Sequence, residues 1–450
     1  MAGKTGKGRF YGWVMVPILC VVYSIPIGFA VYGVPVINTF MSNDLQLQRW
    51  QTNLGYSIIG VVLGLGTLLI PWLLNRFGPK NTIAIGAGLT AVSSVFMALI
   101  GDISVSFFGQ SYPVIYWLIC CFVGLGVSFG SVVPVQALVL LWFNIHRALA
   151  MSLVLGGGAI GGFIYPQIIS HFITVFGNDW KIGWYVIAIA CFIGVLITMM
   201  GVKNRPEDLG QYPDGLSPQQ LKEATKSSGR ALIRTYRSPV NWATSDALRT
   251  RELWLITISI GALLFLWQVL LSQTPAHLLD RGFLADDPVF FLQPAFIYGL
   301  AVAFSIIGRL SLSFLGERIE TRLIIATSGI MLVIGGLFFW LASPDNLWAA
   351  LSFPVLAGIG FGAINVSIPL IVGNYFGVSS FPSLSRIVNP VYFICQYSGP
   401  SVAGLIHDST QGYGLAVLIA CIAGLISTGL IFSCKPPLPK QSGCTGHSHS

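Results

Sequence analysis

The chain has 450 residues, of which 54% are hydrophobic and only 9% are charged. A soluble globular domain is about one quarter charged, so this composition excludes a soluble protein. The formal net charge of +8 could suit a nucleic-acid-binding protein, but the placement of the basic residues explains it in another way.

Apolar runs long enough to cross a lipid bilayer recur along the whole chain. The strands of a membrane barrel are shorter and alternate in polarity, so these continuous runs predict helices. The run that begins at residue 11 is too long for a secretory signal peptide and is expected to remain as the first span. Twelve spans are predicted, at roughly 11–38, 50–74, 81–101, 112–143, 147–173, 180–202, 252–279, 288–315, 322–342, 346–376, 381–406 and 412–433.

Lysine and arginine predict the orientation of these spans. Of the 24 basic residues, 20 lie on the side of the N-terminus, and only Arg49, Lys181 and Arg281 lie on the other side. Basic residues mark the cytoplasmic face, so both termini are expected in the cytoplasm, with the chain integral to the cytoplasmic (inner or plasma) membrane. The positive charge follows from this topology, and no nucleic-acid partner is expected.

A polar stretch at 203–250 divides the spans into two sets of six. We therefore expect an N-terminal bundle (1–202), this cytoplasmic linker, a C-terminal bundle (251–435) and a polar tail (436–450). Polar loops follow the second and fourth spans of both halves, which predicts two six-helix repeats meeting around a central site near the bilayer midplane. The eight cysteines show no metal-ligand spacing and no phosphate-binding loop is present, so neither a cofactor, a metal nor an enzymatic activity is expected.

The stretch "PWLLNRFGPK" (71–80) resembles the signature loop of the major facilitator superfamily. Arg76, Gly78 and Lys80 match the pattern, whereas Asn75 stands where the family usually has aspartate. The resemblance implies a twelve-helix, all-α transporter fold. It also implies that this loop latches the cytoplasmic side, with the charge pairing of the missing aspartate in doubt.

Four further stretches resemble the monocarboxylate and oxalate/formate carriers within that superfamily. They are "FYGWVMV" (10–16), "WFNIHRALAMSLVLGGGAIGGFIYP" (142–166), "NRPEDLGQYPDG" (204–215) and "IIGRLSLSF" (306–314). In that group the arginine of the eighth span binds the substrate carboxylate, and the resemblance gives this role to Arg309.

Arg309 is also unusual on physical grounds, because no other charged residue occurs from Pro288 to Leu315. A charge within the hydrocarbon costs about 2.5–3.5 kcal/mol, and all 16 acidic residues lie in loops or near span ends. A bound anion could neutralise the guanidinium, whose fork matches a carboxylate. A structural role, or a side chain that reaches the cytoplasmic surface, would also account for it, since Glu317 is only eight residues away.

Helical spacing places Tyr298, Val302, Ser305 and Arg309 on one stripe of the eighth span, which would line a cavity. Other polar side chains within spans could contact substrate or pack helices together. These candidates are Tyr32, Gln136, Asn365, Tyr392 and Gln396.

Three departures from the related carriers bear on the substrate. Ser305 replaces an aspartate and Val36 a lysine of animal monocarboxylate carriers, and Gln396 replaces a lysine of oxalate/formate carriers. One deep positive charge suits a singly charged anion and leaves the proton path unidentified. His277, near the outer end of the seventh span, is a candidate for proton coupling or an ordinary interfacial residue.

We therefore predict a secondary transporter of a small organic monocarboxylate such as lactate, pyruvate or formate. It would work as a monomer in the bilayer, with a proton as co-substrate. Moving a lone anion works against the membrane potential at about 2.3 kcal/mol per 100 mV, which favours proton symport or anion exchange. The sequence is also compatible with an exporter of an unrelated solute and with a transporter-like sensor or scaffold that acts through 203–250.

Overall fold

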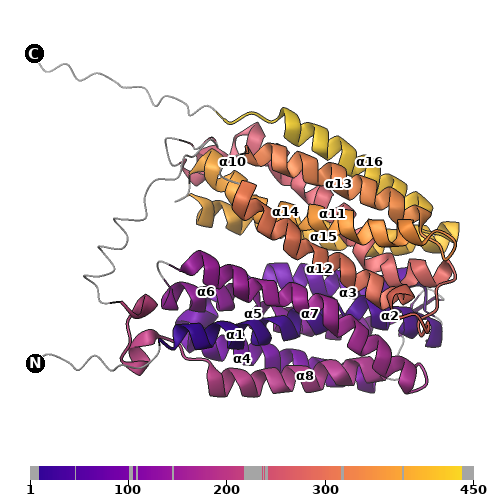
Figure 1. Ribbon diagram of the computed structural model, residues 1–450. Coiled ribbons are helices and arrows are strands. Elements are labelled where there is room, and N and C mark those ends of the chain that lie inside the picture. Colours follow the sequence, from indigo (N-terminus) through magenta and orange to yellow (C-terminus); the bar gives the residue numbers. More distant parts are fainter. Residues whose placement is uncertain are drawn as a thin grey trace, which may run out of the picture.

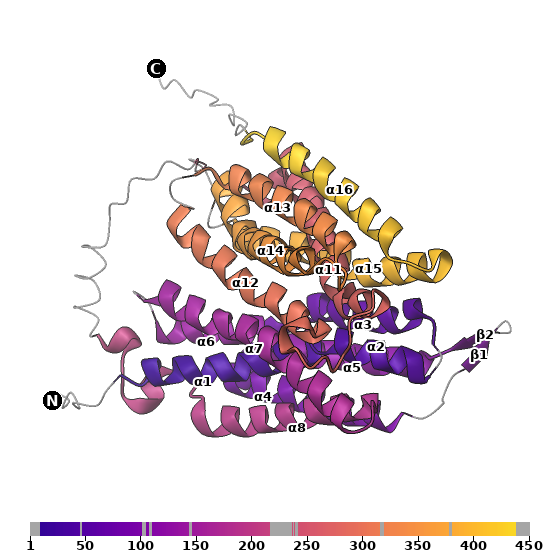
Figure 2. The same cartoon turned by 45° about the vertical axis from the view of Figure 1, so that its right-hand side comes forward.

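The computed structural model describes residues 10–45, 47–100, 105–107, 110–143, 146–216, 236, 238, 242–315, 319–377 and 380–437. Within these residues the protein is a bundle of long helices with one short antiparallel hairpin. The hairpin pairs β1 (Val105–Phe107) with β2 (Gln110–Tyr112) and projects from one end of the bundle (Figure 2). The sequence predicted only a loop at this position.

Helices of the first half supply six spans. They are α1 (Gly12–Ile25) with the π-helix η1 (Pro26–Val31) and α2 (Val34–Asp44), α3 (Arg49–Gly66), α4 (Ile70–Leu99), α5 (Val114–Gly130) with α6 (Val132–Trp142), α7 (Arg147–Val175) and α8 (Trp180–Gly201). The chain reverses direction inside α4 at Gly78, whose φ of 76° lies in the left-handed region that glycine adopts without strain. The end of the second span and the whole third span therefore share one helix label.

Helices of the second half supply the other six. They are α11 (Arg251–Asp280), α12 (Pro294–Leu315), α13 (Thr321–Leu341), α14 (Leu347–Phe376), α15 (Phe381–Thr410) and α16 (Gly414–Ser433). Four short helices lie in the connections: η2 (Pro206–Leu209), η3 (Pro213–Gly215), α10 (Thr244–Leu248) and η4 (Phe290–Leu292). The start of α1 and the end of α16 lie at the same end of the bundle (Figure 1), as an even number of spans requires.

Ten stretches among the described helices are long and apolar enough to cross a membrane by composition alone. The second and eleventh predicted spans are not among them, because α3 opens with the polar run 49–53 and α15 carries Arg386, Asn389 and Gln396. Both helices nevertheless lie inside the bundle and contact each other. Their polarity reflects a position at the interface of the two halves, and the predicted all-α fold with twelve spans is confirmed.

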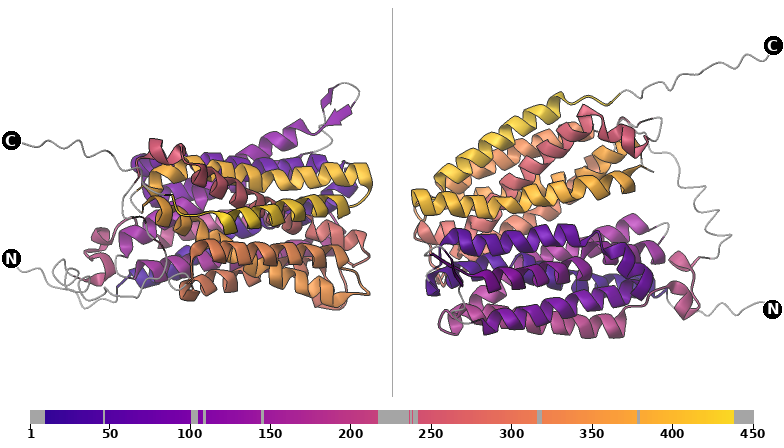
Figure 3. Two further views of the ribbon diagram at one scale, coloured as in Figure 1. Left: turned by 90° about the horizontal axis from the view of Figure 1, so that it is seen from above. Right: turned by 180° about the vertical axis from the view of Figure 1, so that it is seen from behind.

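The two halves form two layers of helices that lie against each other (Figures 1 and 3). They meet along two seams, α3 against α15 and α7 against α12. On the first seam Ser401 Oγ donates a hydrogen bond to Ser57 Oγ at 2.7 Å. On the second, a Cβ at Gly299 would lie 2.7 Å from the Phe163 carbonyl oxygen, so only glycine permits this approach.

The first span is interrupted between Pro26 and Gly33. Pro26 begins the π-helical turn, and Tyr32 lies in the short break before α2 starts at Val34. The residues around Pro35 suggested such a break from the sequence, but Pro35 itself occupies the first turn of α2, where proline is tolerated. The interruption brings the Tyr32 ring against α7, next to the second seam.

Candidate functional site

Arg309 lies on α12, at the seam with α7. Its Nη1 donates a long hydrogen bond of 3.4 Å to the Leu155 carbonyl oxygen of α7, and its Nε is buried without a partner. Within the part of the chain that the structure describes, no carboxylate lies within ion-pair distance of this guanidinium. A charge within a membrane span and a buried donor without a partner are both costly, unless an anion completes the surroundings of Arg309.

Two phenols of the first span lie within electrostatic range of the Arg309 guanidinium, those of Tyr23 and Tyr32. Both rings lean on glycines of α7. A Cβ at Gly158 would lie 2.5 Å from Tyr23 Cε1, and one at Gly162 would lie 2.7 Å from Tyr32 Cδ2. The two glycines therefore provide the room in which these rings reach the interface of the two halves.

A chain of neutral side chains joins the halves on the other seam. Gln396 Nε2 of α15 donates to Gln268 Oε1 of α11 at 2.8 Å, and Gln268 Nε2 donates to the Tyr56 hydroxyl of α3 at 2.8 Å. The Tyr397 ring packs edge-on against Tyr56 with centroids 5.9 Å apart. Because the Tyr56 oxygen accepts the hydrogen bond from Gln268, the hydrogen of the Tyr56 hydroxyl remains available to donate.

Tyr298 lies on α12, the helix that also carries Arg309. Its side chain is fully buried, and its hydroxyl has no hydrogen-bond partner among the described residues. The hydroxyl is within electrostatic range of Tyr32, Tyr56 and Tyr397. An unsatisfied buried hydroxyl costs about 1–3 kcal/mol, which makes this position suited to a ligand that supplies an acceptor.

We call these eight residues the central cluster. It comprises Tyr23, Tyr32, Tyr56, Gln268, Tyr298, Arg309, Gln396 and Tyr397. The structure thus joins four residues that the sequence singled out, Tyr32, Tyr298, Arg309 and Gln396. The four others were missed, although Gln268 interrupts an apolar run of α11 and could have been noticed.

Among the described residues, no hydrogen bond joins the side chains of four other candidates to the cluster. Ser305 is fully buried, its hydroxyl donates to Val302 O of its own helix at 2.6 Å, and its backbone packs against Gly362 of α14. Tyr392 is buried within the second half beside Thr257. Asn365 is exposed on α14 and Gln136 half-buried on α6, and no side-chain hydrogen bond joins either to the cluster.

The signature loop is held within the first half. The Lys80 backbone N–H donates to Asn204 Oδ1 at 2.9 Å, and Lys80 Nζ donates to the Met199 carbonyl oxygen at 2.7 Å. Asn75 and Arg76 are exposed, and the Arg76 guanidinium lies 5.9 Å from the centroid of the Trp72 ring. Gly78 supplies the left-handed turn. Met199 belongs to the first half and Asn204 to the start of the linker directly after α8, so the hydrogen bonds of Lys80 do not join the two halves.

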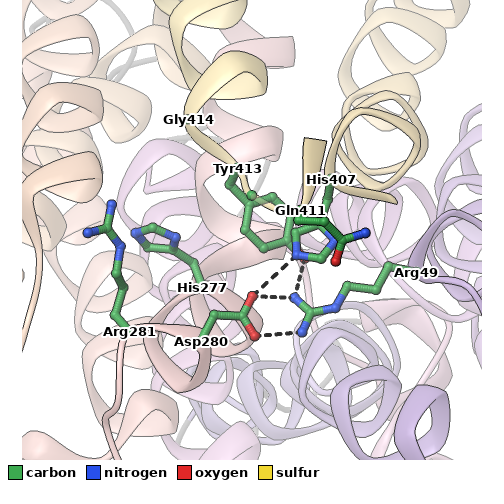
Figure 4. A pocket seen from close by; sticks show the side chains of 9 residues that line it. Arg49, His277, Asp280, Arg281, His407, Gln411, Tyr413 and Gly414 are labelled. Carbon is green, nitrogen blue, oxygen red and sulfur yellow. Dashed lines mark hydrogen bonds and ion pairs between the residues drawn. The ribbon is translucent and has the colours of Figure 1, made fainter. Parts of the chain in front are cut away.

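His277 lies at the opposite end of the bundle from Arg309, because α11 and α12 run antiparallel and each residue is near the C-terminus of its helix. The imidazole is buried, stacks on Phe339 with centroids 4.3 Å apart, and Nε2 donates to the Phe339 carbonyl oxygen at 3.0 Å. It borders a pocket of about 440 Å³ (Figure 4). His277 is therefore not part of the central cluster.

Polar contacts join the two halves at this pocket, and Figure 4 shows those among Arg49, Asp280, His407 and Tyr413. Arg49 of α3 forms a two-pronged ion pair with Asp280 of α11, both contacts at 2.6 Å, and donates to the Tyr413 hydroxyl at 2.8 Å. Asp408 of α15 accepts the backbone N–H groups of Arg49 at 3.3 Å and Trp50 at 2.9 Å. The His407 imidazole lies 3.5 Å from both carboxylates.

We call Arg49, Asp280, His407, Asp408 and Tyr413 the distal clasp. Arg49 belongs to the first half and the other four residues to the second, so the clasp ties the halves together at the end opposite the start of α1. The predicted orientation puts this end outside the cell.

Two six-helix halves of membrane-spanning helices around a shared polar cluster define an integral membrane transporter. The Major Facilitator Superfamily model matches residues 20–403, and the chain belongs to this superfamily. Its relatives are transporters and not enzymes, which confirms that expectation.

Monocarboxylate transporter 2 of Rattus norvegicus is 23% identical over 442 residues, which cover 94% of this chain and 83% of that protein. Riboflavin transporter RibJ of Trypanosoma brucei brucei is 28% identical over 126 residues, so the match spans 28% of this chain and only 22% of RibJ. The crystal structure of a mutant of the nucleoside transporter NupG superimposes with a TM-score of 0.70 at 12% identity, covering 93% of this chain and 99% of that chain. This likeness shows the fold alone.

Proposed function

We propose that the protein is a secondary transporter that moves a small organic monocarboxylate across the cytoplasmic membrane by alternating access, with a proton as co-substrate. One observation carries this proposal: the partly buried Arg309 side chain at the interface of the two halves has a buried Nε without a partner and no carboxylate partner among the described residues. The match to monocarboxylate transporter 2 over most of both chains supports it.

The chemistry of guanidinium suits this role. A carboxylate accepts two parallel N–H donors from arginine, and these charge-assisted bonds are about twice as strong as neutral ones. The 3.4 Å contact with Leu155 O is a weak competitor that substrate can displace. Because Arg309 reaches across to α7, its side chain does not serve only to extend toward the membrane surface.

Alternating access requires a site shared by two halves that rock against each other. The central cluster draws residues from α3 and the first span on one side and from α11, α12 and α15 on the other. The distal clasp closes one end, so the conformation corresponds to a carrier shut at that end. Substrate bound at Arg309 would exchange with the other end in this state.

Proteoliposome uptake of labelled lactate, pyruvate and formate tests the proposal. We expect saturable uptake of at least one acid, and a loss of about 100-fold in Arg309→Ala, because removing one partner of a buried charge pair costs about 2–5 kcal/mol. Arg309→Lys retains part of the uptake, since it keeps the charge without the fork. Arg386→Ala, which removes an exposed arginine of α15, serves as the control and retains full uptake.

Proton symport and anion exchange are separated in the same vesicles. Symport predicts that an inward pH gradient accelerates uptake into empty vesicles, whereas exchange requires vesicles preloaded with the unlabelled anion. His277→Ala, compared with the exposed His171→Ala, tests whether His277 carries the proton. If the pH-gradient dependence persists in His277→Ala, that residue is not the sole carrier of protons.

A further inference from the structure

We propose that the preferred substrate is an extended aromatic monocarboxylate with a neutral oxygen substituent, and that acids of one to three carbons bind more weakly. The inference rests on the proposed function, since it takes Arg309 as the site of the carboxylate. It narrows the class of substrate that the same central cluster would bind.

The central cluster has two ends of different character. At one end, Arg309 lies within range of the Tyr23 and Tyr32 phenols. At the other end, Tyr56, Gln268, Gln396, Tyr298 and Tyr397 form a neutral group. The contacts of this group are made by amides and phenols alone. A second carboxylate of a substrate would find no cation there, which disfavours dianions.

The two ends are too far apart for one small acid to reach both. Tyr298 and Arg309 are eleven residues apart on α12, which is about 16 Å along the helix axis. The Cα–Cβ bonds of both residues tilt toward the start of the helix, so the two side chains leave the helix with this offset. Tyr32 lies along this gap, since a Cβ at Gly162 would meet both the Tyr32 ring and Val302, which stands between Tyr298 and Arg309 on α12. Lactate or formate at Arg309 would leave the hydroxyls of Tyr298 and Tyr56 without a ligand.

The neutral end suits a flat ring that bears an oxygen. The group includes the rings of Tyr56, Tyr298 and Tyr397 from three helices, with Tyr32 from the break in the first span, and aromatic rings pack favourably on one another. The unpartnered hydroxyl of Tyr298 and the remaining hydrogen of Tyr56 are neutral donors. If the phenol of Tyr298 served packing alone, phenylalanine would serve better, because the hydroxyl is buried and unsatisfied.

Isothermal titration calorimetry on the purified protein in detergent tests the proposal with a matched series of acids. The series is lactate, benzoate, 3-phenylpropionate, 3-(4-hydroxyphenyl)propionate and the dianion phenylsuccinate. We expect the Kd of 3-(4-hydroxyphenyl)propionate to be at least about tenfold below that of lactate, with phenylsuccinate the weakest aromatic ligand.

Tyr298→Phe separates the role of the hydroxyl from that of the ring. The variant is expected to raise the Kd of 3-(4-hydroxyphenyl)propionate by about three- to tenfold while leaving 3-phenylpropionate unchanged. Unchanged binding of the second acid shows that the variant is folded. Tyr375→Phe is the control, because Tyr375 is also buried with an unpartnered hydroxyl but lies outside the cluster.

Lactate binding as tightly as the aromatic acids would overturn the inference while leaving the proposed function intact. Equal effects of Tyr298→Phe on both phenylpropionates, or no effect on either, would also overturn it. If no acid of the series binds or is taken up, the proposed function itself fails.

Discussion

At the residue scale, the surroundings of Arg309 depend on two missing groups: side chains at two glycines of α7 and, among the described residues, a nearby carboxylate. Glycines at 158 and 162 on α7 let the Tyr23 and Tyr32 rings approach, and no acid fills the space beside the guanidinium among the described residues. A side chain added on α7 would displace these rings. The position of Tyr32 then decides how the neutral and cationic ends of the central cluster connect.

Gly162→Ala is predicted to weaken carboxylate binding and to lower thermal stability. The added Cβ would lie 2.6 Å from Val302 Cγ1 and 2.7 Å from Tyr32 Cδ2, and such overpacking costs about 1–3 kcal/mol. Gly156→Ala on the same helix is the control, since nothing lies within 4 Å of its added Cβ. Thermal unfolding in detergent and substrate Kd measure both effects; equal behaviour of the two variants would contradict the predicted crowding.

At the element scale, α3 is held to the second half from its first residues. Asp408 caps the backbone N–H groups of Arg49 and Trp50, and a carboxylate there also complements the helix dipole. The ion pair of Arg49 with Asp280 adds a tie to α11. Since both ties lie at one end, they favour the conformation that is closed at that end.

Asp280→Asn and Arg49→Gln are predicted to open the clasp end more often. Labelling of an introduced Ser401→Cys by a membrane-impermeant maleimide should become about tenfold faster, because each variant removes a charge-assisted pair. The same variants without the introduced cysteine give the background of the native thiols. Asp345→Asn, an exposed acid in the loop after α13, is the control.

The exchanged pair Arg49→Asp with Asp280→Arg should restore slow labelling in part. Restoration would show that the pair itself, and not each side chain alone, holds the end closed. If Asp280→Asn and Arg49→Gln are both labelled as slowly as the protein with the native pair, the clasp does not hold the closed state.

The sequence predicts features that depend on neighbouring residues better than contacts between residues that are far apart in the chain. The length of each apolar run predicts a span, because each span must cross the bilayer as a helix of its own. Arg309 is found in the same way, because it is a charged residue within such a run. The partner of Gln268, Tyr56, is 212 residues away, and no local pattern reveals it. Helical spacing places Ser305 on the same stripe as Arg309. It does not reveal that this part of α12 packs against Gly362 of α14, because that contact joins residues far apart in the chain.

At the scale of the whole molecule, two halves meet along α3–α15 and α7–α12, with the central cluster between the seams and the distal clasp at one end. The end of the connection between the halves is fixed to the second half. Trp242 N–H donates to the Phe376 carbonyl oxygen at 3.0 Å, and Ser380 Oγ donates to Trp242 O at 2.7 Å. Each half therefore has its own core, and the seams join them.

The halves are predicted to assemble when they are produced as separate chains, 1–216 and 236–450. A break between these residues severs no described contact, and both seams remain intact. Copurification through a tag on one half, with carboxylate binding retained, is the measurement. A first half that is recovered alone would contradict the claim that the seams suffice for assembly.

The central claim is that Arg309 binds the carboxylate of the substrate, and a cycle that pairs two ligands with two proteins tests it most directly. The ligands are lactate and its neutral isostere lactamide, with 3-phenylpropionate and its amide as a second pair. The proteins are the unmodified chain and Arg309→Gln, and calorimetry gives the Kd of each combination. The account predicts that the unmodified protein prefers the acid of a pair by about 30-fold or more, and that Arg309→Gln loses this preference. An acid preference that survives unchanged in Arg309→Gln would contradict it.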